Sequence, residues 1–172
     1  MNRPSAEPLT IRSANREDVG LMVQLIRELA EYEREPKSAV ATEEDLLRDG
    51  FDAPVPLFQC LIAEWDGEPA GFAFFFKSYS TWHGRPGIHL EDLFVREHVR
   101  ARGIGKALLK AVARVAADEG CTRLNWHVLD WNQPAIDFYE HLGAKILKDW
   151  RICRLSRDAL SALAEGGEKS AR

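Results

Sequence analysis

The sequence predicts a single α/β domain in which helices flank a mixed, mainly antiparallel sheet. Three observations favour this fold class. Short apolar runs alternate with segments of helical period, the Asp66-Gly67 pair indicates a β-hairpin, and a glycine-bearing turn at 100–105 leads from a strand into a helix. The expected order of elements is β-α-α-β-β-β-α-β-α-β-β, with one central crossover.

The first half of the chain contains a strand, two helices and the hairpin. Asn15 has the residue type of a helix cap, with Asp18 three positions later as the acid of a capping box. The apolar residues from Val19 to Ala30 follow the helical period, and Thr42 caps a short second helix. In order, we expect a strand at 9–13, a helix ending near 31, a helix at 43–48, and strands at 58–65 and 69–79.

The second half contains the glycine-bearing turn, which follows a strand with two adjacent acids, Glu91 and Asp92. Adjacent residues of a strand point to opposite faces, so one acid is expected to face the covered side of the sheet or a cleft. The expected elements of this half are a strand at 88–95, a helix at 103–118, a strand at 122–128, a helix from the Asn132 cap to Gly143, strands at 144–147 and 152–155, and a short helix from Ser156.

Composition limits the classes of protein to consider. A length of 172 residues, 45% of them hydrophobic, suits one globular domain, expected at 9–164 between a flexible arm at 1–8 and a polar tail at 165–172. The net charge of −4 argues against nucleic acid as a partner and agrees with a cationic or neutral substrate. Three cysteines without paired metal spacing predict reduced thiols in a cytoplasmic protein with no metal site. The longest apolar run has the length of a strand, so no membrane span is expected.

Residues 94–109 have the pattern of an anion-binding turn. Gly103 and Gly105 carry no Cβ, so the backbone can approach an anion closely, and the helix that follows begins with N–H groups that lack intrahelical partners. Arg100 and Arg102 add positive charge. A P-loop is excluded because no Ser or Thr follows the Gly-Lys pair, and a Rossmann fingerprint because its third glycine is missing. A solvated turn at a glycine-rich helix start is the alternative interpretation.

The match of Arg100, Gly103 and Gly105 to Arg-x-x-Gly-x-Gly resembles the pyrophosphate-binding motif of the GNAT acetyltransferase superfamily. The stretch 132–144 resembles the second motif of that family, Asn-x-x-Ala-x-x-x-Tyr-x-x-x-Gly-Phe/Ala. Further segments at 29–33, 71–73, 90–95 and 131–134 recur in the same order in its diamine and polyamine acetyltransferases, including relatives that acetylate thialysine. The similarity covers roughly residues 9 to 163 and implies a GNAT-like fold.

This resemblance implies acetyl-CoA as the cofactor and roles for the matching residues. Tyr139 would donate a proton to the leaving thiolate, as suits a phenol with an ordinary pKa near ~10, and Glu91 would relay the proton of the amine. The residues expected to bind the cofactor are Leu93, Phe94, Val95, Arg100, Ala101, Arg102, Gly103, Ile104, Gly105, Lys106, Asn132, Ala135 and Tyr139. Those expected to bind the amine are Tyr32, Glu33, Trp82, Glu91, Asp92 and Asp149.

The leading hypothesis is therefore an N-acetyltransferase that acts on a small primary amine by direct attack in a ternary complex. Lys148 stands where animal polyamine enzymes carry an acid, which disfavours spermidine or spermine and favours a shorter diamine or an amino acid with a terminal amine. A protein lysine or N-terminal acetyltransferase is a second hypothesis. A non-catalytic acyl-CoA-binding module is a third, which the presence of Tyr139 and Glu91 disfavours. Family analogy also predicts a homodimer.

Several residues have plainer interpretations as well. Tyr139 by itself fits a packing residue of an amphipathic helix, the acidic cluster at 31–35 fits a solvated helix end, and Trp82 fits a residue packed in its loop. The motifs around them, rather than these residues alone, favour the functional interpretation.

Overall fold

The computed structural model describes residues 8–166, which fall into two compact units, Met1–His127 and Val128–Arg172. The expected arm at 1–8 and polar tail at 165–172 lie, apart from Pro8, Glu165 and Gly166, outside the described residues. No helix among the described residues is both long and apolar enough to cross a membrane.

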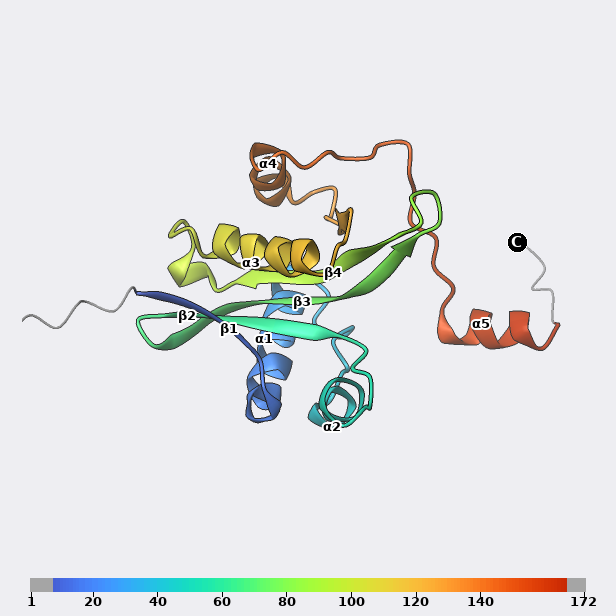
Figure 1. Ribbon diagram of the computed structural model, residues 1–172. Coiled ribbons are helices and arrows are strands. Elements are labelled where there is room, and N and C mark those ends of the chain that lie inside the picture. The colour runs from blue at the N-terminus through green and yellow to red at the C-terminus, as the bar shows by residue number, and fades with distance from the viewer. Residues whose placement is uncertain (1–7, 167–172) are drawn as a thin grey trace, which may run out of the picture. The chain divides into compact units, whose positions relative to one another are not determined.

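The described part of the first unit contains a five-stranded sheet in the order β1-β2-β3-β4-β5 (Figure 1). Its strands are β1 (Leu9–Ser13), β2 (Gln59–Trp65), β3 (Glu68–Ser80), β4 (Arg85–Val95) and β5 (Leu124–Asn125). Neighbouring strands are antiparallel from β1 to β4, whereas β4 and β5 are parallel and are joined through α3 (Ile104–Asp118). This architecture confirms the predicted mixed, mainly antiparallel sheet with one crossover.

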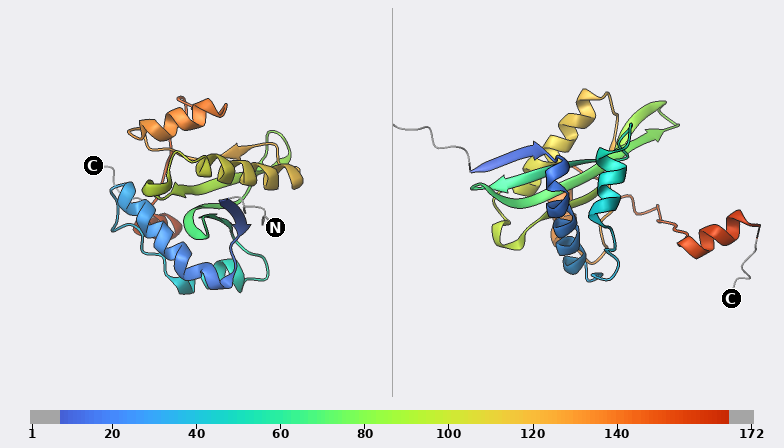
Figure 2. Two further views of the ribbon diagram at one scale, coloured as in Figure 1. Left: turned by 90° about the vertical axis from the view of Figure 1, so that its left-hand side faces the viewer. Right: turned by 90° about the horizontal axis from the view of Figure 1, so that it is seen from below.

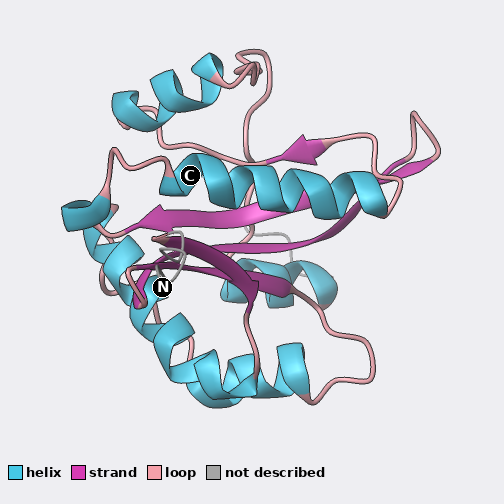
Figure 3. Cartoon of the chain, turned by 60° about the vertical axis from the view of Figure 1, so that its left-hand side comes forward, coloured by secondary structure: helices cyan, strands magenta, loops and turns pink. Residues whose placement is uncertain are grey.

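Helices cover both faces of this sheet. The helices α1 (Val19–Tyr32) and α2 (Glu43–Leu46) lie on one face and α3 lies on the other, as Figures 2 and 3 show. The predicted caps are confirmed: Asn15 Oδ1 accepts from the Glu17 N–H at 2.9 Å, and the Asp18 carboxylate accepts from the Asn15 N–H at 2.8 Å. A single 3-10 turn then leads into α1. The helix expected at 43–48 does not end at Arg48 but continues past Leu46 as a π-helical turn, Leu47–Phe51.

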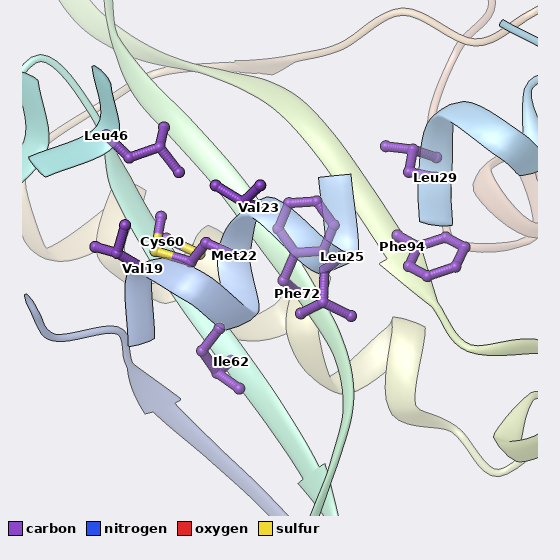
Figure 4. Packing of buried hydrophobic residues seen from close by; sticks show 10 residues of the cluster. All are labelled: Val19, Met22, Val23, Leu25, Leu29, Leu46, Cys60, Ile62, Phe72 and Phe94. Carbon is purple, nitrogen blue, oxygen red and sulfur yellow. The ribbon is translucent and has the colours of Figure 1, made fainter. Parts of the chain in front are cut away.

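The main core lies between α1 and the sheet (Figure 4). Its members are the apolar residues of one face of α1, Leu46 of α2, and residues of β2, β3 and β4, namely Val19, Met22, Val23, Leu25, Leu29, Leu46, Cys60, Ile62, Phe72 and Phe94. Burial raises the pKa of the Cys60 thiol to about 12, so this cysteine is a protonated packing residue. All three cysteines are free thiols: Cys60 is buried, Cys121 is half-buried and Cys153 is exposed.

The end of the chain differs from the prediction. The second unit contains α4 (Gln133–His141) and α5 (Arg157–Ala164), but residues 144–156, expected to form two strands, are irregular. The strand expected at 122–128 is reduced to the two residues of β5. A strand requires a hydrogen-bonded neighbour, and no described segment pairs with 144–147 or 152–155. Apolar alternation alone therefore overestimated the number of strands.

Candidate active site along strand β4

The glycine-bearing turn follows β4 and ends at the first residue of α3. Ala101 and Gly103 have positive φ angles of 61° and 80°, and Gly103 is the N-cap of α3. The Ala107 N–H donates to the Gly103 carbonyl at 3.0 Å, which is the first hydrogen bond of the helix. The N–H groups at 104–106 therefore precede the helical hydrogen bonds and form the positive end of the helix dipole. This arrangement suits a bound anion.

The two motif arginines have different surroundings. Arg100 Nε donates to the Val95 carbonyl at 2.8 Å, and its guanidinium carbon lies 4.4 Å from the centre of the Tyr32 ring. The guanidinium carbon of Arg102 lies 5.1 Å from the centre of the Trp65 ring, and Arg102 is otherwise exposed. Arg100 thus joins the turn to the end of β4 and to the end of α1, whereas Arg102 remains at the rim.

A third arginine, which the sequence analysis missed, fixes the entry to the turn. Arg96 donates from Nε and Nη2 to the carboxylate of Glu28 on α1, both at 2.8 Å, and from Nη1 to the Pro69 carbonyl, also at 2.8 Å. Its own N–H donates to the Ala70 carbonyl at 2.9 Å. This fork holds the chain against α1 and β3 just before the turn begins. Glu28 and Arg96 are 68 positions apart in the sequence, so no local sequence pattern indicates that they pair.

The last residues of β4 run very close to β3 on one side. A Cβ at Gly71 would collide with the Phe94 carbonyl oxygen and lie 3.0 Å from Val95 Cα, so only glycine fits there. On the other side, the described pairing of β4 with β5 ends at His89 and Asn125. The edge of β4 from Leu90 to Val95 therefore presents backbone groups that no described strand pairs with, and an extended ligand could hydrogen-bond to them.

A β-bulge places the acids of β4. In the ladder with β3, Phe74 is opposite Asp92 and Phe75 is opposite Leu90, so Glu91 is the extra residue. Adjacent residues of β3 point to opposite faces, and Asp92 therefore lies on the Phe74 side, which packs on the α1 core, whereas Leu90 lies on the α3 side. The expectation that Glu91 and Asp92 point in opposite directions needs revision, because the bulge interrupts the alternation at that point.

The acids gathered on the α1 side have perturbed titration. Burial raises the pKa of Asp92 from its ordinary value of 3.8 to about 7, and the carboxylates of Glu91 and Glu33 add to the increase. Burial also raises the pKa of Glu33, which follows the last residue of α1. Asp92 and Glu33 are thus partly buried carboxyl groups whose ionised forms a bound cation would stabilise.

Asp92 thus lies three residues before the end of β4 at Val95, and the turn suited to a diphosphate begins at Arg100, shortly after the same strand. Residues 20–144 match the model of the acetyltransferase (GNAT) family. The chain belongs to this family. It is accordingly an acyltransferase, and the GNAT fold and the resemblance inferred from the sequence are confirmed.

Known relatives agree with this assignment. The chain is 43% identical over 165 residues to the thialysine N-epsilon-acetyltransferase of Bos taurus, covering 90% of this chain and 96% of the relative. It is 49% identical over 94 residues to the L-ornithine N5-acetyltransferase of Arabidopsis thaliana, covering 55% of this chain and 41% of that protein. A solved aminoglycoside N-acetyltransferase in complex with CoA shares the fold, with a TM-score of 0.71 at 23% identity over 91% of this chain and 99% of its own.

GNAT acetyltransferases use acetyl-CoA, and the turn fits the diphosphate of that molecule. The Cβ position of Gly103 faces open space, the N–H groups at 104–106 are clustered, and Arg100 and Arg102 supply charge. The side chains of Phe94 and Ile104 are 7% and 1% exposed. These two predicted cofactor residues can therefore contribute only backbone groups, while their side chains hold the turn on the core.

One residue predicted to bind the amine, Trp82, does not lie near the acids of β4. Trp82 lies in the turn between β3 and β4 and is 88% exposed. Ser80, where β3 ends, is six residues along the strand from Phe74, the partner of Asp92, which amounts to about 20 Å at ~3.3 Å per residue. Trp82 therefore does not reach Asp92 in its own chain. An irregular loop was expected at 80–87, but both strands extend into it.

The remaining predicted residues belong to the second unit. Asn132 and Tyr139 are buried, and Ala135 is half-buried. The Ala135 N–H donates to Asn132 Oδ1 at 3.4 Å, so Asn132 caps α4, as predicted. Gly143 has a φ of 89° just after α4, which confirms its predicted role in ending the helix. Asp149 is exposed in the irregular segment.

Proposed function

We propose that the protein is an acetyl-CoA-dependent N-acetyltransferase that acetylates the primary amine of a small molecule by direct attack in a ternary complex. The observation that carries this proposal is the arrangement of β4. Its bulge gathers acids suited to an ammonium group, and the same strand ends at a turn suited to a diphosphate. A thioester and an amine bound at these two places would meet over the short stretch between them.

Acetyl-CoA would supply the activated acyl group. The N–H groups at 104–106 and the side chains of Arg100 and Arg102 would hold its diphosphate. The backbone of Leu93, Phe94 and Val95 would pair with its extended arm, and Ala101 and Lys106 would flank the diphosphate. From the second unit, Asn132 and Ala135 would contact the same arm, in line with the resemblance of their motif.

The amine end would be formed by Glu33, Asp92 and Tyr32. A cationic substrate favours the ionised form of Asp92, because opposite charges attract strongly where burial has removed water. The ring of Tyr32 contacts Arg100 of the turn, and Glu33 follows Tyr32 directly at the end of α1. The end of α1 would thus contribute to both parts of the site, with Tyr32 beside the cofactor turn and Glu33 beside the amine.

The proton steps are assigned to Glu91 and Tyr139. Glu91 would accept a proton from the ammonium group, which must become a neutral amine before it can attack. Tyr139 would donate its phenolic proton to the departing thiolate. The site thus needs one acceptor on the amine side and one donor on the thiol side.

The relatives favour a short substrate with a terminal amine. Their names specify thialysine and L-ornithine, which are amino acids of this kind. Lys148, next to the predicted substrate residue Asp149, would repel the far end of a long polycation. We therefore expect diamines and lysine-like amino acids to be better substrates than spermidine or spermine.

A homodimer is part of the proposal. In the second unit the segment 147–163 exposes large apolar side chains, between 53% and 71% of each, namely Leu147, Trp150, Ile152, Leu155, Leu160 and Leu163. None of the residues of α5 is buried. A second copy of the chain could cover these side chains and supply the neighbour that the expected strands lack. Light scattering should show a dimer, and Leu160→Glu with Leu163→Glu should weaken it.

The activity test uses the purified full chain with acetyl-CoA and a panel of amines. We expect release of free thiol with L-ornithine, lysine, thialysine and short diamines, and slower release with spermidine. Tyr139→Phe should lower kcat about 100-fold while the affinity for CoA changes less than twofold. Absence of thiol release with every amine would overturn the proposed function, and unchanged kcat in Tyr139→Phe would remove the acid role of that residue.

A further inference from the structure

Two histidines lie in a row beside Glu91, and the outer one, His127, is exposed. Glu91 Oε2 lies 3.4 Å from His89 Nε2, and the rings of His89 and His127 are 5.1 Å apart between centroids. The side chain of His89 is 19% exposed and that of Glu91 is 53% exposed, while His127 is an exposed residue. The ring of Phe76 on β3 covers His89 from the other side, with its centroid 5.1 Å away.

The sheet itself produces this alignment. His89 and Glu91 are two positions apart on β4, a spacing that places side chains on the same side of a strand. His89 is the register partner of Asn125 on β5, and His127 follows Asn125 by the same spacing. The strand thus places His89 and Glu91, whereas His127 lies two residues beyond the end of β5 in an irregular segment. The sequence shows only a His-x-Glu pair and a distant histidine.

We propose that His89 accepts the proton that Glu91 removes from the amine and passes it by way of His127 to solvent. This inference rests on the proposed function, because it assumes that Glu91 receives the proton of the substrate. The ammonium group loses one proton to the Glu91 carboxylate. The resulting carboxylic acid passes the proton to His89 Nε2, and the imidazolium of His89 releases a proton toward His127. Each acetylation releases one proton to water, with no change in oxidation state.

The charges around His89 agree with an acceptor. Burial lowers its pKa below the ordinary value of 6.5, the Glu91 carboxylate raises it, and His127 lowers it again. Phe76 on the adjacent strand β3 carries no charge, and Asp92 is not among the groups that shift the pKa of His89. His89 is therefore neutral at pH 7 and can take up a proton. Because His89 acts through Glu91, it is a positioning and relay residue.

The decisive variant is His89→Gln, which keeps a polar group beside Glu91 but cannot carry a proton. We expect the single-turnover rate of acetyl transfer at pH 7 to fall about tenfold, with the KM for the amine and the affinity for CoA nearly unchanged. Added imidazole should restore much of the rate, because a soluble base can replace the missing acceptor. His83→Gln, in the turn between β3 and β4, is the matched control and should behave as wild type. An unchanged rate, or a loss that imidazole does not restore, would overturn the relay.

A second measurement does not depend on activity. Nuclear magnetic resonance titration of the histidines in the full chain should show that Glu91→Gln lowers the pKa of His89, since the carboxylate that favours the imidazolium is gone. A His89 pKa that does not respond to Glu91→Gln would overturn the inference even if acetylation occurs. If wild type acetylates no amine but the His89 pKa still responds to Glu91→Gln, the proposed function fails and the relay fails with it. The contact between His89 and Glu91 would still be confirmed in that case.

Discussion

The two ends of the proposed site on β4 consist of different chemical groups. At the downstream end, the turn at 100–106 offers backbone N–H groups and glycine conformations, and its geometry is fixed by the packing of Phe94 and Ile104. At the upstream end, the site consists of carboxylates whose charge depends on burial, above all Asp92. CoA binding at the turn should therefore depend on shape and not on pH. Amine binding at the acids should depend on pH and less on shape. Four predictions test this difference.

The largest effect is expected from Gly71→Ala, which acts on shape alone. The added Cβ collides with the backbone of Phe94 and Val95, and a backbone cannot rotate out of the way as a side chain does. We expect the free energy of unfolding to fall by about 3 kcal/mol, in the range of overpacked cores, and the affinity for CoA to fall more than tenfold because the end of β4 is displaced. Urea unfolding and calorimetric titration with CoA measure the two quantities.

Gly20→Ala is the matched control for this substitution. Gly20 lies in α1, and the nearest atom to its added Cβ is Glu43 Oε1 at 3.4 Å, which is the flexible end of a side chain. Alanine favours a helix by about 1 kcal/mol over glycine, so this variant should be as stable as wild type or more so, with unchanged CoA affinity. Equal stability of the two variants would contradict the close approach of β3 and β4.

The second effect concerns charge and is expected at Asp92. Because its pKa is about 7, the carboxyl group is neutral below that pH and anionic above it. The affinity of CoA-saturated protein for a cationic amine should rise with pH below pH 7, by about tenfold in total, and level off above it. Asp92→Asn should bind the amine about tenfold more weakly at pH 8 and lose most of this dependence. CoA affinity should be unchanged in the variant. If the amine affinities of wild type and Asp92→Asn change with pH in the same way, Asp92 is not the group that binds the cation.

The same group has a predictable effect on stability. The folded pKa of Asp92 lies above its unfolded value near 3.8, so between about pH 4 and 7 the folded state holds a proton that the unfolded state has lost. The free energy of unfolding of wild type should therefore decrease as pH rises through this window. Asp92→Asn should remove most of that slope and be the more stable protein at pH 8. Glu33, whose pKa is also raised, should leave a residual slope.

The same two ends differ in how far the sequence could predict them. The turn was predictable because Arg100, Gly103 and Gly105 lie within one short stretch, where local conformation decides the geometry. The acids on β4 could be listed, but not oriented, because the bulge at Glu91 depends on the register with β3. Strand pairing is also why Trp82 was expected to bind the amine together with Asp92 although it lies far along the strands from it, and why Arg96 and His89 were missed. The strands expected at 144–147 and 152–155 failed because pairing, which a pattern does not contain, is needed to form a strand.

The smallest effect tests whether the turn depends on charge at a distance. Glu28→Gln keeps the shape of the side chain but removes the negative charge that two nitrogens of Arg96 share. The pair is partly exposed, at 19% for Arg96 and 29% for Glu28, so we expect a loss of only about 1 kcal/mol in the free energy of unfolding. The affinity for CoA should fall about threefold, because Arg96 fixes the entry to the turn but would not touch the ligand. Glu31→Gln, an exposed acid near the end of the same helix, controls for the change in net charge. If both variants weaken CoA equally, or if 0.5 M salt abolishes the difference between Glu28→Gln and wild type, the long-range field of the acids would be responsible, and the fork of Arg96 would have no role in holding the turn.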